Sequence, residues 1–144
     1  MTAFPTTAMD RCAGGRLETP PRVLGERDLL FCALWGGDGQ PHSNEEYSRM
    51  SPWGRRILHG DGVFGVGLGM LANECDFAGL ADADDMKIKY AGPVYIGDAI
   101  TAALEITESD NGSGLVCEVL IQNQTQSSVA VRATLTFRGE GAAR

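Results

Sequence analysis

The chain has 144 residues, of which 43% are hydrophobic and 22% charged, and its formal net charge is −7. This length suits a single domain that buries roughly two thirds of the surface exposed by its unfolded chain. The acidic balance argues against nucleic acid or anionic lipid as partners, because both require clustered Lys and Arg. No apolar run approaches the ~20 residues of a membrane span, so we expect a soluble protein.

Residues 1–21 contain Thr, Ala, Gly and Pro without a continuous apolar core, so we expect a flexible tail and no secretory signal. Apolar residues at helical spacing predict a short helix over residues 26–35, ending at two glycines. Ser43 and Glu46 fit a capping box, which predicts a second short helix. Pro52 is expected to end that helix.

From His59 to about Phe77 nearly every residue is apolar or glycine, which is compatible with a buried helix or a buried strand. The length favours a helix. Glycines at positions 60, 62, 65, 67 and 69 each cost up to ~1 kcal/mol of helix propensity relative to alanine. We therefore predict a sheet wrapped closely around this helix, where a side chain would collide.

The remaining sequence predicts strands over residues 86–90, 99–107, 115–123 and 128–137. Turns are expected at residues 110–114 and near 124–127. Helices followed by an antiparallel meander indicate an α+β fold with the sheet around one buried helix. The predicted domain covers residues 22–138, and residues 139–144 form a second tail.

The four cysteines are scattered and form no Cys-x-x-Cys pair, so neither a zinc site nor a redox pair is indicated. We expect no metal or cofactor, and a reducing cytoplasm is the default location. The two histidines are more informative. His42 ends a Gly-Asp-Gly-Gln-Pro-His segment that contains Asp38, and His59 precedes Gly60 at the start of the apolar helix. An acid, an imidazole and a helix N-terminus together indicate an acid/base site.

Three segments resemble the MaoC-like (R)-specific enoyl-thioester hydratase and dehydratase family, whose fold is the hot-dog fold. Residues 37–42 look like its Gly-Asp-x-Asn-Pro-x-His loop, and residues 57–60 are similar to its apolar-apolar-His-Gly helix entry. Residues 93–98 resemble its Pro-Val-x-x-Gly-Asp turn. The resemblance covers about residues 23–137, and it implies an antiparallel sheet wrapped around a long central glycine-rich helix.

The loop departs from the family pattern, because no residue separates its proline from its histidine and Gln40 replaces the usual asparagine. Asn44 and Tyr47 keep the family spacing after His42, which favours a deletion before the histidine. The other alignment places Ser43 where the histidine belongs. A serine often found further down the family's central helix is also missing here.

The resemblance implies that Asp38 and His42 hold and activate water across a homodimer interface, while the Gly60 N–H polarises a thioester carbonyl. His59 is expected to order the loop. The implied substrate is an acyl thioester of coenzyme A or acyl carrier protein, with no nucleic acid or membrane partner. Residues expected to contact it are His59, Arg55, Arg56, Asp61, Val63 and Phe64.

Two other functions remain open at this point. A hot-dog thioesterase uses a carboxylate on or near the central helix to activate water, and Asp61 or Glu74 has that placement. Alternatively, the altered loop belongs to a non-catalytic subunit that binds an acyl carrier. Hydration, hydrolysis and binding assays would separate the three.

Overall fold

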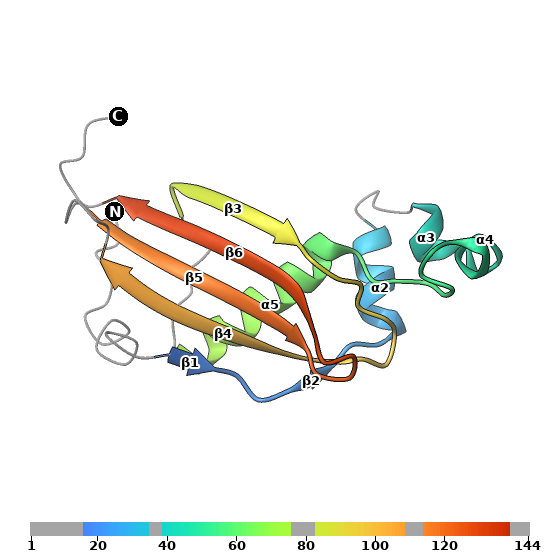
Figure 1. Cartoon of the computed structure of the whole chain (residues 1–144), viewed down its shortest axis with the longest axis horizontal. Coiled ribbons are helices and arrows are strands. Elements are labelled where there is room, and N and C mark those ends of the chain that lie inside the picture. The colour runs from blue at the N-terminus through green and yellow to red at the C-terminus, as the bar shows by residue number, and fades with distance from the viewer. Residues whose placement is uncertain (1–15, 35–38, 76–82, 109–113, 139–144) are drawn as a thin grey trace.

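The computed structural model describes residues 16–34, 39–75, 83–108 and 114–138, which form one antiparallel sheet crossed by a long helix (Figure 1). None of the helices in these ranges is long and apolar enough to cross a membrane. The strands are β1 (Arg16–Glu18), β2 (Arg22–Val23), β3 (Asp85–Tyr90), β4 (Ala99–Glu108), β5 (Gly114–Asn123) and β6 (Ser128–Arg138). The helices are α2 (Glu26–Ala33), α3 (Gln40–Ser43), α4 (Glu45–Met50) and α5 (Gly60–Cys75).

The strand order is β1-β4-β5-β6-β3, with β2 also paired to β4. The four predicted strands are confirmed to within a residue or two at each end. Their order corrects the expected meander, because β3 pairs with β6 at the far edge and not with β4, the next strand along the chain. Of the two predicted turns, residues 124–127 form one, whereas residues 109–113 lie outside the described part.

The N-terminal segment is more ordered than predicted, because β1 pairs with β4 through Arg16–Glu18. Thr19 extends this pairing: its N–H donates to the Ala102 carbonyl at 2.9 Å, and its hydroxyl accepts from the Ala102 N–H at 3.1 Å. The prediction of a flexible tail over residues 1–21 is therefore wrong for Arg16–Glu18. Residues 1–15 and 139–144 lie outside the described ranges.

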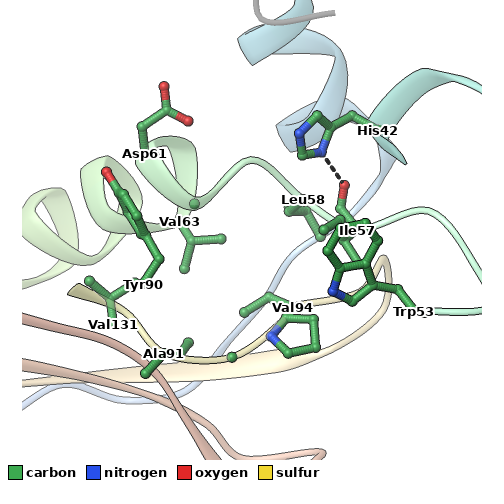
Figure 2. Close-up of a pocket in the computed structure, with 14 residues that line it drawn as sticks. His42, Trp53, Ile57, Leu58, Asp61, Val63, Tyr90, Ala91, Val94 and Val131 are labelled. Atoms are coloured by element: carbon green, nitrogen blue, oxygen red, sulfur yellow. Dashed lines mark hydrogen bonds between the residues drawn. The ribbon is translucent and has the colours of Figure 1, made fainter. Parts of the chain in front are cut away.

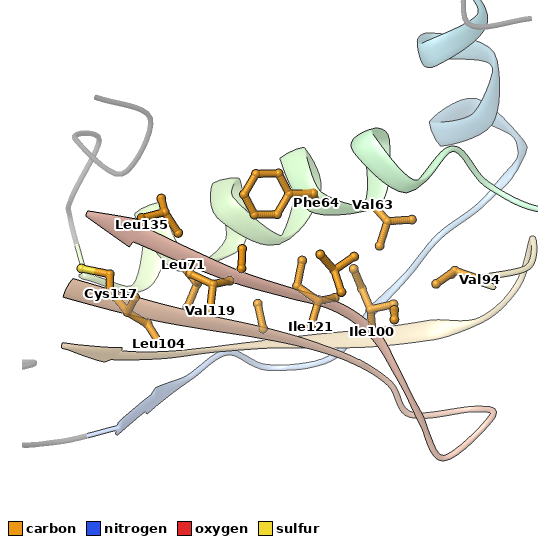
Figure 3. Close-up of a cluster of buried hydrophobic side chains, with 14 of the residues drawn as sticks. Val63, Phe64, Leu71, Val94, Ile100, Leu104, Cys117, Val119, Ile121 and Leu135 are labelled. Atoms are coloured by element: carbon orange, nitrogen blue, oxygen red, sulfur yellow. The ribbon is translucent and has the colours of Figure 1, made fainter. Parts of the chain in front are cut away.

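Helix α5 lies across one face of the sheet, and the hydrophobic core fills the space between them (Figure 3). Its 16 residues span about 24 Å. Full burial of a side chain such as Leu71 stabilises the fold by roughly 1.5–3 kcal/mol relative to exposure. The core residues drawn and labelled in Figure 3 are Val63, Phe64, Leu71, Val94, Ile100, Leu104, Cys117, Val119, Ile121 and Leu135.

The glycines of α5 have three different surroundings. A Cβ at Gly67 would collide with Ile121 of β5, and one at Gly60 would lie 2.7 Å from the ring of Tyr90 in β3. The predicted close approach of the sheet is confirmed at these two positions. Gly62 instead faces Cys32 of α2, while Gly65 has no atom of the described residues within 4 Å of its Cβ position. Gly69 is equally open, so the sheet does not explain either of these two.

Short helices precede α5 and extend beyond one end of the sheet (Figure 1). Helix α3, one turn within the predicted loop, was not foreseen from the sequence. The next helix was predicted, but its N-cap is Asn44 and not Ser43: the Asn44 side chain accepts from the Tyr47 N–H at 3.0 Å. Ser43 closes α3, and its hydroxyl donates to the Gly39 carbonyl at 3.2 Å. The helix ends at Met50, two residues before Pro52.

Candidate active site

The two histidines meet at the start of α5. His42 comes from α3 and His59 immediately precedes α5, and their rings stack with centroids 3.8 Å apart and planes inclined by 21°. His59 is buried, with 6% of its surface exposed. The structure thus joins two imidazoles that the sequence pattern placed in separate segments.

A backbone hydrogen bond orients the His42 imidazole. Its Nδ1 lies 2.8 Å from the carbonyl oxygen of Ile57 (Figure 2). Because a carbonyl only accepts, Nδ1 carries the proton in this contact, and Nε2 of the neutral ring is left as an acceptor. An imidazole in this tautomer can take a proton from water.

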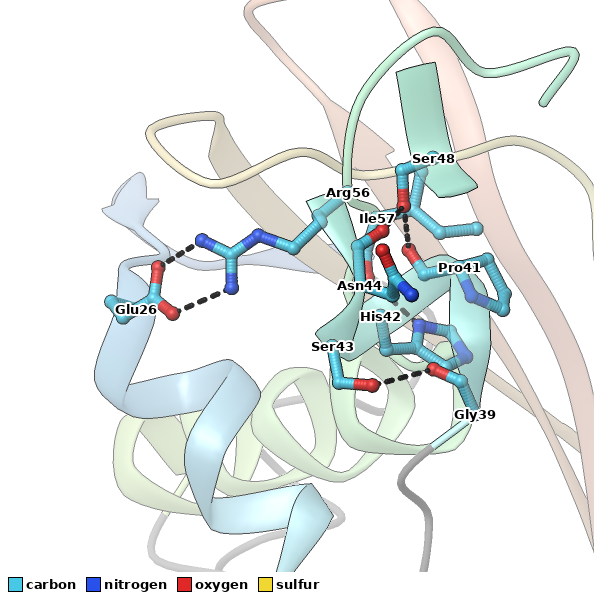
Figure 4. Close-up of polar contacts among 9 residues, drawn as sticks. All are labelled: Glu26, Gly39, Pro41, His42, Ser43, Asn44, Ser48, Arg56 and Ile57. Carbon is cyan, nitrogen blue, oxygen red and sulfur yellow. Dashed lines mark hydrogen bonds and ion pairs between the residues drawn. The ribbon is translucent and has the colours of Figure 1, made fainter. Parts of the chain in front are cut away.

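The loop that carries His42 is held by the segments around it (Figure 4). The Ile57 N–H donates to the Pro41 carbonyl at 3.1 Å. The buried Ser48 hydroxyl lies 3.1 Å from that carbonyl and 2.7 Å from the Asn44 carbonyl. These bonds fix α3 against α4 and against the strand-like segment before α5, so His42 has a defined position.

A cavity of about 630 Å³ lies beside the first turn of α5 (Figure 2). Gly60 is the first residue of α5, and the N–H groups of a helix's first turn have no acceptor within the helix. The positive end of the helix dipole therefore faces a site that also contains an imidazole. The lining residues are His42, Trp53, Ile57, Leu58, Gly60, Asp61, Val63, Tyr90, Ala91, Gly92, Pro93, Val94, Ala130 and Val131.

A second cavity, of about 970 Å³, lies between α5 and α2. Leu58 and Asp61 line both cavities, so the two spaces flank the same turn of α5. His59 lines this second cavity, together with the open positions Gly65 and Gly69. The stacked pair therefore contributes one imidazole to each cavity.

Asp61 influences two neighbouring titratable groups. Burial raises the pKa of the Tyr90 phenol, and the Asp61 charge raises it further. Burial also raises the pKa of the Cys32 thiol, with Asp61 and then Asp28 adding to the effect. At neutral pH Tyr90 is thus a hydrogen-bond donor, and Cys32 is a thiol and not a thiolate nucleophile.

The predicted site residues divide into three groups. His42, Gly60, Asp61 and Val63 come together at the smaller cavity, and His59 stacks behind His42. Asp38 lies outside the described residues. Phe64, Arg55 and Arg56 have different surroundings.

Phe64 packs in the hydrophobic core between α5 and the sheet. Arg55 lies over the Tyr95 ring at 4.0 Å. Arg56 binds both carboxylate oxygens of Glu26 at 2.8 Å, and this hydrogen bonding lowers the pKa of Glu26. Within the described ranges, no three His, Cys, Asp or Glu side chains are grouped so that they could hold a metal ion.

Glu74 lies near the other end of α5. It follows Gly60 by fourteen positions, which corresponds to roughly 21 Å along the helix axis. A carboxylate at that distance cannot act on a group bound at the helix N-terminus.

Sequence reasoning missed two aromatic residues of the smaller cavity, Tyr90 and Trp53. The sequence pattern places Tyr90 only in a strand, although it precedes Pro93 of the third motif by three positions. Trp53 belongs to a loop, where its carbonyl accepts from the Tyr95 hydroxyl at 3.3 Å. The sequence signal available for both was an aromatic residue close to a motif.

Comparisons with known proteins agree on one family. A family model described as MaoC like domain matches residues 10–128. An (R)-specific enoyl-CoA hydratase of Rhodospirillum rubrum is 28% identical over 127 residues, which cover 88% of this chain and 78% of the relative.

Two solved structures have the same arrangement of elements. One is described as a MaoC-like dehydratase from Rhodospirillum rubrum: its TM-score is 0.71 at 19% identity, with 95% of this chain and 98% of the other covered. The second is an (R)-hydratase from A. caviae described as involved in PHA biosynthesis, with a TM-score of 0.70 at 18% identity. That match covers 85% of this chain and 92% of the other. At these identities the structures establish the fold.

Proposed function

Because this chain belongs to the MaoC-like domain family and has the α+β hot-dog fold, we propose that it is a hydro-lyase acting on an acyl thioester. It adds water to an enoyl thioester of coenzyme A or acyl carrier protein, or eliminates water from the 3-hydroxyacyl thioester. The observation that carries the proposal is the His42 imidazole, which Ile57 holds in one tautomer at a cavity that includes the N-terminus of α5.

Hydration needs a base, an acid and a donor for the enolate oxygen. In the proposed reaction Asp38 and His42 hold the water and remove one proton while its oxygen bonds to the β-carbon. The double bond shifts to lie between the α-carbon and the thioester carbon, and the carbonyl electron pair moves to the thioester oxygen, where the Gly60 N–H stabilises the enolate. The acid/base pair then delivers the proton taken from water to the α-carbon, which completes the addition, and the reverse order eliminates water.

Other side chains have supporting roles in this proposal. His59 positions the His42 ring by stacking, and Val63 contacts the acyl group. Arg55 and Arg56 lie next to each other before α5 and contact the phosphate of the carrier arm in this proposal. To do so, Arg55 has to leave the Tyr95 ring and Arg56 has to leave the Glu26 carboxylate.

We also propose that the protein works as a homodimer in the cytoplasm. Strand β3 is an edge of the sheet, and an edge strand exposes backbone N–H and C=O groups that a second copy can pair. The scattered cysteines suit a reducing compartment.

The first test follows the absorbance of a short trans-2-enoyl coenzyme A. We expect His42→Ala and Asp38→Asn to lower kcat by 10²-fold or more, the usual contribution of general acid–base catalysis. Ser43→Ala is the matched control, because it tests the alternative alignment of the loop. Loss of activity in the Ser43 variant with full activity in the His42 variant would overturn the assignment.

A thioesterase remains the second candidate because Asp61 lines both cavities beside the helix N-terminus. Thiol release is therefore measured in parallel with the loss of the double bond. Thiol release that disappears in Asp61→Asn would identify hydrolysis. Loss of the double bond without thiol release supports hydration.

A further inference from the structure

Tyr90 is held in one position over the start of α5. It ends strand β3, where it pairs with Val131 of β6, and the following Ala91 N–H donates to the Ala130 carbonyl at 2.8 Å. The ring lies so close to Gly60 that a Cβ there would be 2.7 Å from its Cδ1 atom. Backbone pairing and ring packing together determine where the phenol oxygen lies.

The phenol of Tyr90 and the carboxylate of Asp61 form a polar edge on the smaller cavity. Both residues are exposed, Tyr90 to 53%. Figure 2 shows the two polar groups pointing to the same side of the first turn of α5, away from Val94 and Ala91. With its raised pKa the phenol donates at neutral pH, while the carboxylate accepts and already holds the Gly62 N–H at 2.9 Å.

The interior of the same cavity is apolar. Val63, Val94, Ala130 and Val131 line it, and each is at most 3% exposed. An apolar acyl group fits this interior, and the edge formed by Tyr90 and Asp61 offers the rest of a thioester substrate a polar way out of the cavity. The arm shared by coenzyme A and acyl carrier protein contains secondary amides, each with one N–H donor and one C=O acceptor.

On the basis of the proposed function, we infer that Tyr90 and Asp61 bind the amide-bearing arm of the thioester. The Tyr90 hydroxyl donates to an amide carbonyl and the Asp61 carboxylate accepts from an amide N–H. The N–H and C=O of a trans amide point in opposite directions, so the arm passes between the Tyr90 and Asp61 side chains. Tyr90 and Asp61 are therefore specificity-determining residues that select an amide-bearing carrier over a simple thioester.

The experiment compares two thioesters of the same short enoyl acid, one of N-acetylcysteamine, which carries one amide, and one of ethanethiol, which carries none. Tyr90→Phe keeps the ring that packs on Gly60 and removes only the hydroxyl. We expect KM for the amide-bearing thioester to rise about three- to tenfold, the size of one hydrogen bond, with kcat within twofold. KM for the ethanethiol ester should not change. Asp61→Asn should raise KM for the amide-bearing thioester more than for the ethanethiol ester, because the neutral side chain is a weaker acceptor.

Tyr47→Phe is the matched control, because Tyr47 is an exposed tyrosine of α4 and its backbone N–H is capped by Asn44. It should leave both thioesters unaffected. An equal rise in KM for both thioesters in Tyr90→Phe would overturn the inference, because the hydroxyl would then act on the acyl group or on folding. No change for either ester would also overturn it.

Binding of the saturated butyryl analogues, measured by calorimetry, separates this inference from the proposed function. If the wild type hydrates neither enoyl ester, the proposed function fails. If Tyr90→Phe binds the amide-bearing analogue more weakly than wild type does, and binds the other analogue equally well, an amide contact is still supported. Equal affinity of wild type and Tyr90→Phe for that analogue would overturn it.

Discussion

At the scale of single residues, His42 is placed mainly by backbone groups. Its partner is the Ile57 carbonyl, and the Pro41 carbonyl in turn accepts from the Ile57 N–H. The sequence identified His42 from its type and its Gly, Asp and Pro neighbours. It could not reveal the tautomer, because the acceptor is a carbonyl in a segment far along the chain. The sequence predicted Ser43 as the N-cap of α4, whereas the structure has Asn44, one residue later. Serine and asparagine are both favourable N-caps, so only the backbone geometry separates them.

The Glu26–Arg56 ion pair makes stability depend on pH. Hydrogen bonding to Arg56 lowers the folded-state pKa of Glu26 below the unfolded value of about 4.3. The stabilisation is therefore present above that value and is lost as the pH falls through the folded pKa. We expect Glu26→Gln to be less stable than wild type by about 0.2–1 kcal/mol at pH 7 and equal to it at pH 2, measured by urea unfolding.

Glu45→Gln is the matched control for this measurement. Glu45 pairs with Arg49 at the same 2.8 Å, but both side chains are more than 60% exposed. We expect a smaller effect there. If Glu26→Gln is less stable than wild type by the same free energy of unfolding at pH 7 and at pH 2, the Glu26–Arg56 pair is not the cause.

At the scale of elements, α5 illustrates what local sequence can and cannot reveal. Its length and apolar content predicted the helix, and its glycines predicted a close neighbour. Glycine and apolar residues alternate around the whole helix, so the sequence could not tell which side meets the sheet, which meets α2 and which stays open. The structure assigns these sides at Gly67, Gly62 and Gly65 respectively.

These different surroundings predict opposite effects of the same substitution. Gly67→Ala places a methyl group against the fully buried Ile121, and we expect it to destabilise the fold by about 1–3 kcal/mol despite the better helix propensity. Gly65→Ala meets no described atom within 4 Å and should stabilise the fold by up to ~1 kcal/mol. Urea unfolding of both variants tests the difference. If Gly67→Ala is the more stable of the two, the packing argument is wrong.

At the scale of the whole molecule, the periodicity of the sequence predicted the fold class and the four longer strands. It did not predict which strands pair with each other. Strand β3 lies beside β6, and β1 beside β4, because pairing between distant segments is decided by how the sheet wraps α5. Strands as short as β1 and β2 leave almost no alternation to detect. The position of α3 and α4 beyond the sheet likewise depends on contacts between separate segments.

The edge at β3 allows a direct test of the proposed dimer. The Ala91 N–H donates to the Ala130 carbonyl in register with the β3–β6 pairs, and donors alternate along an antiparallel strand, so the Ile88 N–H points away from β6. Ile88→Pro removes this outward donor, and we expect a shift from dimer to monomer in sedimentation equilibrium. Ile88→Ala controls for the lost side chain, and circular dichroism checks that the proline variant is folded. A folded proline variant that remains dimeric would place the interface elsewhere.

The open positions Gly65 and Gly69 have a consequence for how such a protein can change over generations. Both line the larger cavity, and an added Cβ at either position would meet no atom of the part of the chain that the structure describes. In most enzymes, residues that reshape a binding site reduce stability, and other mutations have to compensate. Here a glycine replaced by a larger residue would narrow the cavity and strengthen the helix in one step. Narrowing this cavity is therefore thermodynamically favourable, whereas widening it again has to give up stability.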